Sequence, residues 1–396
     1  MSEYLMNTYP RLPLTFACGE GVWLWDLQGN KYLDALCGVS VTNIGHAHPR
    51  LTAAIAKQSK LLMHCSNLYR VAAQEELARK LCELSAMQRV FFCNSGAEAN
   101  EAAIKLARLH AHRRGIHEPI IVVMEAAFHG RTLATLAATG NTRAQAGFGP
   151  MPSGFLRIPY GDINTLRALR RKRNIAAVMI EPVQGEGGVR LPPAGYLQQV
   201  RDLCTRKNWL MILDEIQCGM GRSGRWFAHQ HEGITPDVMT LAKGLGGGFP
   251  IGACLAQGEA AELFAPGSHG STFGGNPLAC RAAQAVVETI INDDLCVRAT
   301  ALGERIQNGL REGLAGVVGV IEIRGKGLMI GVELDRPCGE LVKLALDQHL
   351  LINVTAERVI RLLPPLILKD SEADQISAIV VELVKSFLAK PVESAA

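Results

Sequence analysis

The chain has 396 residues, 48% of them hydrophobic, and its 41 basic side chains nearly balance its 37 acidic ones. This length exceeds the roughly 250–300 residues that one hydrophobic core usually serves, so we expect two domains. A net charge of +4 is too small over such a length to indicate a nucleic-acid partner. No stretch approaches the roughly 18–20 uninterrupted apolar residues of a membrane span, so we expect no membrane partner.

The N-terminus and the cysteines predict a cytoplasmic protein. The opening MSEYLMNTYPRLPL has an early acid, no basic flank and only a broken apolar run, unlike a signal peptide. The eleven cysteines are an odd number, and the nearest two, Cys82 and Cys93, stand eleven positions apart. This spacing argues against zinc-binding pairs and against a secreted disulfide framework. We expect reduced thiols and no metal site.

The first 59 residues contain a strand-like segment, GVWLWDLQGNKYLDAL, with a turn at Gly29 and Asn30. We expect them to pack on the C-terminal part of the chain or across a subunit contact. From about residue 70, helical patterns alternate with short apolar runs, which is typical of a mainly parallel sheet covered on both faces. The predicted strands are Arg89–Cys93, Ile120–Met124, Ala176–Ile180, Leu210–Leu213, Val238–Leu241 and Ala253–Ala256.

Three helices are predicted among these strands, at Gly96–Arg114, Thr165–Arg173 and Tyr196–Lys207. The second ends in a run of basic residues, which we interpret as the solvated end of a helix rather than a binding patch. The run consists of Arg167, Arg170, Arg171, Lys172 and Arg173.

The pattern changes after residue 275. Two long helices, an antiparallel hairpin, a helix, two short strands and a final helix predict an α+β unit. We therefore predict an α/β fold with a large domain over residues 60–275 and a small domain made of residues 1–59 and 276–396. The bounded elements of this part are helices Leu278–Ile291 and Cys296–Leu314, hairpin strands Val317–Ile323 and Leu328–Leu334, and short strands Leu351–Val354 and Val359–Leu363.

In an open α/β sheet, ligands bind outside the carboxyl ends of the strands, so the residues that follow each strand are the candidates for a site. Asn94-Ser95-Gly96-Ala97 forms a small polar turn before a long helix, whose unpaired N–H groups and dipole suit a phosphate. The same turn is also explained by Ser95 as an ordinary N-cap. No dinucleotide glycine pattern and no P-loop occurs, which excludes NAD and ATP.

Two ionisable residues follow other strands. Lys243 precedes a glycine-rich stretch. If its side chain is buried, the pKa of the amine is lowered and the amine can act as a nucleophile. The alternative is an ordinary surface lysine. Asp214 ends an apolar run, and its partner would be a pyridinium nitrogen, a helix N-terminus or a core cation. His129 has no adjacent Ser or Cys nucleophile motif, so we interpret it as structural rather than as a general base. With Phe128 to stack on a ring, this set is what a pyridoxal phosphate enzyme requires.

Several segments resemble those of the class III, fold type I aminotransferases, a family of pyridoxal phosphate enzymes. The likeness runs in the family's order from about Gly21 to Leu366. GVWLWDLQGNKYLDALCGVSVTNIGHAHP and HCSNLY fit the acetylornithine branch of this family. The other matching segments are NSGAEANEAAIKLAR, FHGRTLATLAATG, EPVQGEGG, LDEIQCGMGRSG, LAKGLGGGFPIGA and STFGGNPLA.

The resemblance implies a role for each matching residue. Lys243 would bind pyridoxal phosphate as a Schiff base and move the proton between the substrate Cα and the cofactor C4′, and Asp214 would pair with the pyridinium nitrogen. Other contacts would come from Gly96 and Ala97 at the phosphate, Phe128 on the ring, Gln217 at the phenolic oxygen, and Thr272, with Ser271 beside it, reaching the cofactor or substrate from the neighbouring subunit of a homodimer.

The resemblance also implies how two substrates share the site. Arg131 would bind the α-carboxylate of acetylornithine or the side-chain carboxylate of glutamate, because a guanidinium fork is the preferred carboxylate receptor. Arg361 would bind the α-carboxylate of glutamate, and Glu186 would pair with Arg361 when the other substrate is present. Taken in isolation, Glu186 and Arg361 would be a surface pair worth at most about 1 kcal/mol.

The implied reaction moves the terminal amino group of N2-acetyl-L-ornithine to 2-oxoglutarate, giving N-acetyl-L-glutamate 5-semialdehyde and L-glutamate, as in arginine biosynthesis. Enzymes for succinylornithine, N-succinyldiaminopimelate, ornithine and 4-aminobutyrate share these motifs and stay open, although the lack of a long N-terminal extension speaks against an organelle-targeted enzyme. A non-catalytic binding module of the same fold is the alternative of a different class, and the presence of Lys243 and Asp214 speaks against it. Arg131 and the Glu186–Arg361 pair together suit two alternating substrates, and this disfavours a racemase, mutase or decarboxylase.

Overall fold

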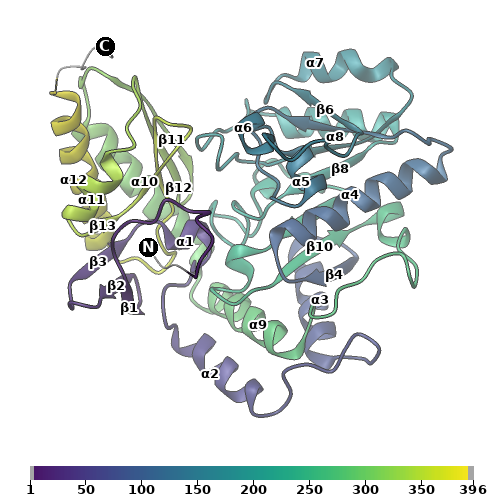
Figure 1. Ribbon diagram of the computed structural model, residues 1–396, viewed down its shortest axis with the longest axis horizontal. Coiled ribbons are helices and arrows are strands. Elements are labelled where there is room, and N and C mark those ends of the chain that lie inside the picture. The colour runs from purple at the N-terminus through teal and green to yellow at the C-terminus, as the bar shows by residue number, and fades with distance from the viewer. Residues whose placement is uncertain (1–3, 391–396) are drawn as a thin grey trace.

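The computed structural model describes residues 4–390, so residues 1–3 and 391–396 of the predicted small domain lie outside the described residues. A seven-stranded sheet with the order β4-β10-β9-β8-β7-β5-β6 forms the centre of the part that lies on the right in Figure 1. Only β10 runs antiparallel to its neighbours. The strands are β4 Arg89–Cys93, β5 Ile120–Met124, β6 Phe155–Ile158, β7 Ile175–Ile180, β8 Leu210–Asp214, β9 Val238–Leu241 and β10 Gly252–Ala256.

The predicted α/β class with a mainly parallel central sheet is confirmed. All six predicted strands are present, each shifted by at most one residue at either end. The sequence analysis missed β6, which lies at the edge of the sheet and carries Arg157 among apolar residues. A strand at an edge is not buried on all sides, so it does not form a continuous apolar run.

Helices cover both faces of this sheet, as predicted. Alternating residues of β7 point to opposite faces: Met179 packs with α4 and Val178 with α8. Helix α7 ends at Ala168 and continues as a 3-10 turn to Arg171, so the predicted helix was too long, but all five residues of the basic run are exposed. The helices of this part are α3 Ala72–Ser85, α4 Gly96–Arg113, α5 Leu133–Ala138, α6 Thr142–Gln145, α7 Ile163–Ala168 and α8 Tyr196–Lys207.

The C-terminal part contains the predicted α+β unit. Its sheet has the order β11-β12-β15-β14, and the predicted hairpin is the antiparallel pair of β11 and β12. The first strand of this hairpin begins and ends three residues later than predicted. Helices α10 and α12 pack against each other beside this sheet (Figure 1). The elements are α9 Pro277–Asn292, α10 Leu295–Gly313, β11 Val320–Lys326, β12 Met329–Leu334, α11 Leu341–Asp347, β13 Leu350–Leu351, β14 Asn353–Thr355, β15 Val359–Leu362 and α12 Asp370–Leu388.

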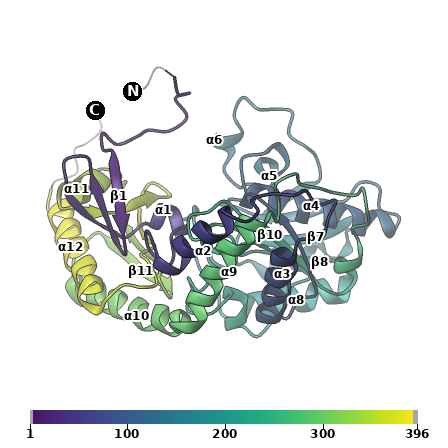
Figure 2. The same ribbon diagram turned by 90° about the horizontal axis from the view of Figure 1, so that it is seen from below.

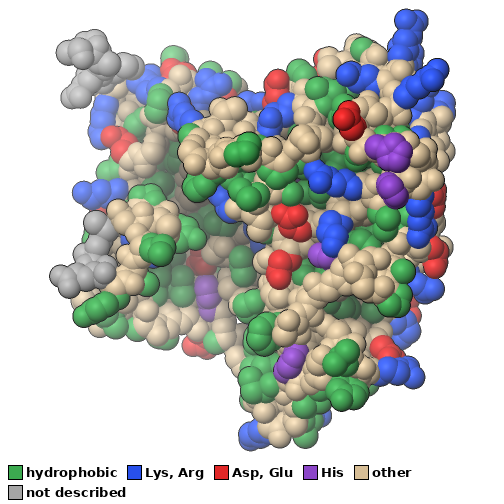
Figure 3. Space-filling view, turned by 45° about the vertical axis from the view of Figure 1, so that its right-hand side comes forward, with side chains coloured by type: hydrophobic (Ala, Val, Ile, Leu, Met, Phe, Trp, Pro, Cys, Tyr) green, Lys and Arg blue, Asp and Glu red, His purple; other side chains and the backbone are tan. Residues whose placement is uncertain are grey.

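The N-terminal segment packs on this C-terminal unit. Strand β3 pairs in parallel with β13, so that Leu33 lies opposite Leu350, and α2 packs along α9 (Figure 2). The two parts of the molecule flank a depression (Figure 3). The boundaries at residues 59/60 and 275/276 stay a prediction. The N-terminal elements are β1 Phe16–Glu20, β2 Trp23–Asp26, β3 Lys31–Asp34, α1 Cys37–Ser40 and α2 Pro49–Ser59.

None of the helices between residues 4 and 390 has the length and apolar character that crossing a bilayer requires.

One buried arginine joins the two parts of the molecule. Arg222, 1% exposed, lies on the loop after β8. Its Nε donates to Ser40 Oγ at 3.0 Å, and its Nη1 donates to the carbonyl of Leu328 at 3.1 Å and to that of Pro364. Burial lowers the pKa of this guanidinium. The hydrogen bonds connect the central sheet to α1, to the hairpin and to the segment after β15.

Replacing Arg222 with Ala should lower the thermal-unfolding midpoint by roughly 5 °C or more. The change leaves two buried carbonyls without a donor, at about 1–3 kcal/mol each. Differential scanning calorimetry measures the shift, and Arg225→Ala, which truncates an exposed arginine on the same loop, is the matched control. A shift no larger than that of the control would contradict the joining role of Arg222.

Candidate active site

A cavity of about 400 Å³ lies at the carboxyl ends of the parallel strands, where the sheet topology predicts a ligand site. Its walls come mainly from the segments that follow β4, β5, β7, β8 and β9. Of the predicted site residues, seven line this cavity: Gly96, Ala97, Phe128, Arg131, Asp214, Gln217 and Lys243.

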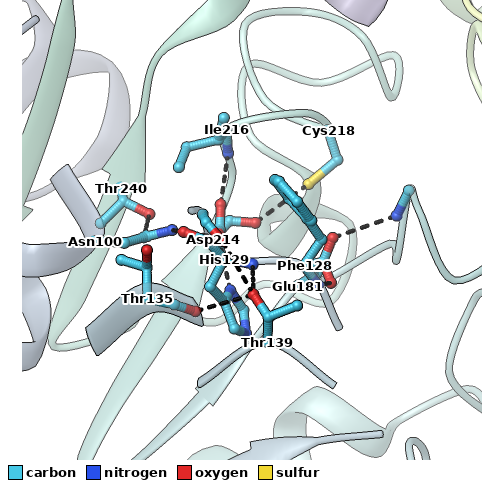
Figure 4. Close-up of polar contacts among 12 residues, drawn as sticks. Asn100, Phe128, His129, Thr135, Thr139, Glu181, Asp214, Ile216, Cys218 and Thr240 are labelled. Carbon is cyan, nitrogen blue, oxygen red and sulfur yellow. Dashed lines mark hydrogen bonds and ion pairs between the residues drawn. The ribbon is translucent and has the colours of Figure 1, made fainter. Parts of the chain in front are cut away.

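Asp214, the last residue of β8, is held in one orientation by its neighbours (Figure 4). It is 4% exposed, and its Oδ2 accepts hydrogen bonds from Asn100 Nδ2 and His129 Nδ1, both at 2.8 Å. Thr240 Oγ1 donates to Asn100 Oδ1 at 2.7 Å, which turns the amide nitrogen of Asn100 toward the carboxylate. Oδ1 accepts the N–H of Ile216 at 3.1 Å. The carboxylate is therefore fixed at the cavity wall.

His129 has the structural role that the sequence indicated. Its Nδ1 is occupied by Asp214, and the buried Nε2 has no hydrogen-bond partner within residues 4–390. Burial favours the neutral ring, but the hydrogen bond and charge of Asp214 outweigh it and raise the pKa of His129. A ring that is engaged with a carboxylate in this way positions that carboxylate.

Lys243 follows β9 and lies in the cavity, so the alternative of a surface lysine is wrong. Its backbone is left-handed, with φ of 44°, which is uncommon for a residue with a side chain and is typical of functional sites. Burial lowers the pKa of its amine, and the positive charge of Arg361 lowers it further, whereas Glu186 opposes the shift. A lowered pKa is what a nucleophilic lysine needs.

The polar turn before α4 combines the two features that the sequence indicated, an N-cap and free N–H groups. Ser95 is the N-cap, and its Oγ accepts the N–H of Glu98 at 3.2 Å. Gly96 and Ala97 line the cavity, and their N–H groups donate to no residue in the described part of the chain. A Cβ at Gly96 would come 2.9 Å from the side chain of Ile216, so glycine permits this close approach. Free N–H groups at the N-terminus of a long helix suit a phosphate.

Phe128 and Arg131 lie on the loop after β5. Phe128 contributes a ring to the cavity wall, and the guanidinium of the exposed Arg131 lies 5.4 Å from its centre. The side-chain set around the cavity fits pyridoxal phosphate, because it offers free amides for a phosphate, a fixed carboxylate for a protonated ring nitrogen, an aromatic face and an amine of lowered pKa.

Comparison with known proteins identifies the family. The family model described as "Aminotransferase class-III" matches residues 4–384 of this chain. The chain belongs to the class-III aminotransferases. This aminotransferase is 56% identical to the acetylornithine aminotransferase 1 of Bordetella bronchiseptica, over 98% of this chain and 100% of the relative.

Two solved structures illustrate the likeness. The first is an ornithine aminotransferase from Toxoplasma gondii, with pyridoxal phosphate at partial occupancy in its active site; it has a TM-score of 0.94 and 34% identity, over 98% of this chain and 94% of that one. The second is the acetylornithine aminotransferase from Elizabethkingia anophelis, with a TM-score of 0.88 and 36% identity, over 96% of both chains. The chain is a pyridoxal phosphate-dependent enzyme.

Glu186 and Arg361 form an ion pair beside the cavity of this aminotransferase. Arg361 Nη1 lies 2.5 Å from Glu186 Oε1 and also donates to Gln217 Oε1 at 3.2 Å. The guanidinium is 1% exposed, whereas the Glu186 side chain is 38% exposed. Asn353 Oδ1 accepts from Arg361 Nε at 2.9 Å. The pair is thus not a surface pair, and Gln217 connects it to the cavity.

Ser271 and Thr272 do not line the cavity of their own chain. The Oγ of Ser271 accepts from Asn94 Nδ2 at 3.3 Å and from the N–H of Gly274 at 2.9 Å. Thr272 lies at a separate small hollow with His64.

Three site residues were missed by the sequence analysis: Asn100, Glu181 and Thr240. Asn100 lies on the buried face of α4 among alanines and leucines, and a fully buried asparagine on such a face is a signal for a polar partner. Glu181 directly follows β7, as Asp214 ends β8, so the reasoning applied to Asp214 applies to Glu181 as well. Thr240 lies within a strand, where nothing in the sequence sets it apart.

Replacing Asn100 with Ala should lower kcat about 10- to 100-fold, because Asp214 loses one of its two side-chain donors and its orientation with it. Steady-state kinetics of the purified variant measure the loss. Asn164→Ala, at an exposed position of α7, is the control and should keep the wild-type kcat. An unchanged kcat for Asn100→Ala would show that His129 alone is sufficient to hold the carboxylate.

Proposed function

We propose that this aminotransferase transfers the terminal amino group of N2-acetyl-L-ornithine to 2-oxoglutarate, giving N-acetyl-L-glutamate 5-semialdehyde and L-glutamate, as a step of arginine biosynthesis. The name of the Bordetella bronchiseptica relative supports this substrate, at 56% identity over its whole length. The structural observation that carries the proposal is a pair of arginines: Arg131 lines the cavity and is exposed, whereas Arg361 lies beside the cavity, contacts its lining residue Gln217 and is masked by Glu186. That arrangement suits two substrates with different numbers of carboxylates.

The cofactor, when bound, supplies an electron sink for the charge that develops at the substrate carbon. Lys243 would bind it covalently, and its Nζ would take the proton from that carbon and pass it to the C4′ carbon of the cofactor. The carboxylate of Asp214 would keep the ring nitrogen protonated. The remaining contacts proposed are the Gly96 and Ala97 N–H groups at the phosphate, Phe128 against the ring and Gln217 at the phenolic oxygen.

The two substrates differ in what they offer to Arg361. Its guanidinium is buried, and a buried charge without a counter-ion costs several kcal/mol. With acetylornithine, we propose that Glu186 stays paired with Arg361 while Arg131 binds the substrate's single carboxylate. Glutamate brings a second carboxylate, which would replace that of Glu186 at Arg361. The Glu186 side chain is already 38% exposed, so water can solvate it when it is displaced.

We further propose a homodimer in which Ser271 and Thr272 reach the cavity of the partner subunit. Two adjacent segments, residues 61–69 and 271–273, support this, because Asn67 Nδ2 donates to the carbonyl of Ser271 at 3.1 Å and His64 packs on Phe273 at 5.4 Å. An exposed apolar patch of this kind is typical of a protein interface. The exposed apolar side chains on these segments are Leu61, Leu62, Met63, Leu68, Tyr69 and Phe273.

A cytoplasmic location is part of the proposal. The eleven cysteines of the chain all lie in the described part and all carry free thiols, most of them buried. Such a set of thiols suits a reducing compartment.

An absorbance screen of half-reactions tests the proposed substrate. Purified enzyme without any keto acid is mixed in turn with acetylornithine, succinylornithine, N-succinyldiaminopimelate, ornithine and 4-aminobutyrate. We expect acetylornithine to deplete the visible band of the bound cofactor fastest, and a faster reaction with another donor would replace the proposed substrate. Lys243→Ala, which removes the reacting amine, is the control and should show neither the band nor turnover.

Replacing Arg361 with Ala should slow the glutamate half-reaction about 100-fold, because removing one partner of a buried contact between a guanidinium and a carboxylate costs about 2–5 kcal/mol. The acetylornithine half-reaction should stay within a few-fold of wild type. Stopped-flow absorbance of both half-reactions measures the difference. Arg143→Ala, which removes an exposed ion pair with Glu357, is the control. Equal losses in the two half-reactions would refute the exchange of carboxylates at Arg361.

A further inference from the structure

Glu181 lines the cavity, yet the reaction proposed above gives it no role. It follows β7 and is 5% exposed. Each oxygen of its carboxylate accepts one backbone hydrogen bond, Oε2 from the N–H of Phe128 at 3.0 Å and Oε1 from the N–H of Gly185 at 3.3 Å (Figure 4). A buried carboxylate with both oxygens engaged in this way is held in place by the backbone and in turn holds the backbone.

The two N–H groups belong to different parts of the site. Residues 128–131, the Phe128 segment, carry the aromatic ring and Arg131 on the cavity wall. Residues 185–186, the Glu186 segment, carry the carboxylate that pairs with Arg361. The Glu181 carboxyl group is therefore the polar contact that these two segments share. Glu181 itself is anchored by the hydroxyl of Tyr160, which donates to its carbonyl oxygen at 3.1 Å.

We propose that Glu181 is a positioning residue, whose carboxylate holds the Phe128 segment and the Glu186 segment at the spacing that turnover requires. The proposal rests on the proposed function, because the roles of Phe128, Arg131 and Glu186 define what the spacing is for. Glu181 acts through these neighbours, since both of its oxygens are occupied by backbone donors.

The positioning depends on the charge of Glu181. The charged and titratable groups that face it are His129 after β5, Tyr160 after β6, Asp214 on β8 and Lys243 after β9. Burial raises the pKa of Glu181 to about 7, and among its neighbours His129 lowers it and Asp214 raises it. Above this pH, both oxygens accept an N–H. Below it, one oxygen carries a proton, and the contact with the N–H facing that oxygen is weakened.

The sign of the pH effect follows from this. The ionised form makes both backbone contacts, so turnover should rise as the pH increases through about 7 and fall as the pH decreases through it. A glutamine at this position imitates the protonated form at every pH, because its NH2 group faces an N–H donor and cannot accept from it.

Glu181→Gln is the variant to measure, with the glutamate half-reaction followed by stopped-flow absorbance at several pH values. We expect a rate about tenfold or more below wild type near pH 8, and loss of the rise through pH 7 that the wild type shows. Glu125→Gln, which changes an exposed carboxylate directly after β5, is the matched control and should keep both the rate and the pH profile.

Hydrogen exchange gives a second readout that does not require turnover. In the cofactor-free protein, peptides that cover residues 128–131 and 185–186 should exchange faster in Glu181→Gln than in wild type, because one of the two backbone contacts is lost. Wild-type rate, pH profile and exchange in this variant would overturn the proposal.

Two choices keep this test decisive. If Glu181→Gln does not fold, Glu181→Asp takes its place, because it keeps the charge on a shorter side chain. This variant should react slowly but retain a pH-dependent rate. A wild-type rate in Glu181→Asp would overturn the proposal. The glutamate half-reaction does not depend on which amino donor the enzyme prefers. Failure of acetylornithine to react would therefore remove the proposed substrate and leave the result for Glu181 intact.

Discussion

The carboxylate of Asp214 is 4% exposed at the end of β8, where a negative charge is stable only with hydrogen-bond donors around it. Its donors come from three places: Asn100 on α4, His129 after β5 and the backbone of Ile216. The need to satisfy one buried charge therefore fixes how α4 and the loop after β5 approach the sheet. That approach in turn places the free N–H groups of α4 and the ring of Phe128 on the same cavity.

The guanidinium of Arg361 is a second buried charge, which lies beside the cavity. Arg361 is as deeply buried as Asp214, whereas its partner Glu186 is partly exposed, so water reaches only one member of this pair. The charges of Glu186 and Arg361 shift the pKa of Lys243 in opposite directions. While the two are paired, their effects on the amine oppose each other, and burial is the main influence on Lys243. The pair that we propose to serve substrate choice thus also leaves burial as the main influence on the Lys243 amine.

The sequence was sufficient where function follows a local pattern. Lys243 and Asp214 could be found because each stands at the end of a short apolar run, and this run is visible without knowing what it packs against. Asn100, Glu181 and Thr240 were missed because their importance lies in partners far along the chain: Asn100 and Asp214 are joined by one hydrogen bond across 114 positions. Strand β6 was missed for a related reason, since an edge strand with Arg157 has no continuous apolar run. The place proposed for Thr272 involves a second chain, which no pattern within one chain can show.

The parallel pairing of β3 with β13 has a consequence for how the chain is made. Leu33 and Leu350 face each other in this pair, although 317 positions separate them in sequence. During synthesis, the N-terminal strands leave the ribosome first and can pair with one another, but β3 lacks its partner β13 until the C-terminal unit has emerged. Contacts between such distant positions are slow to form, because a long loop must close first. The part of the protein that is synthesised earliest is therefore among the last to reach its final place.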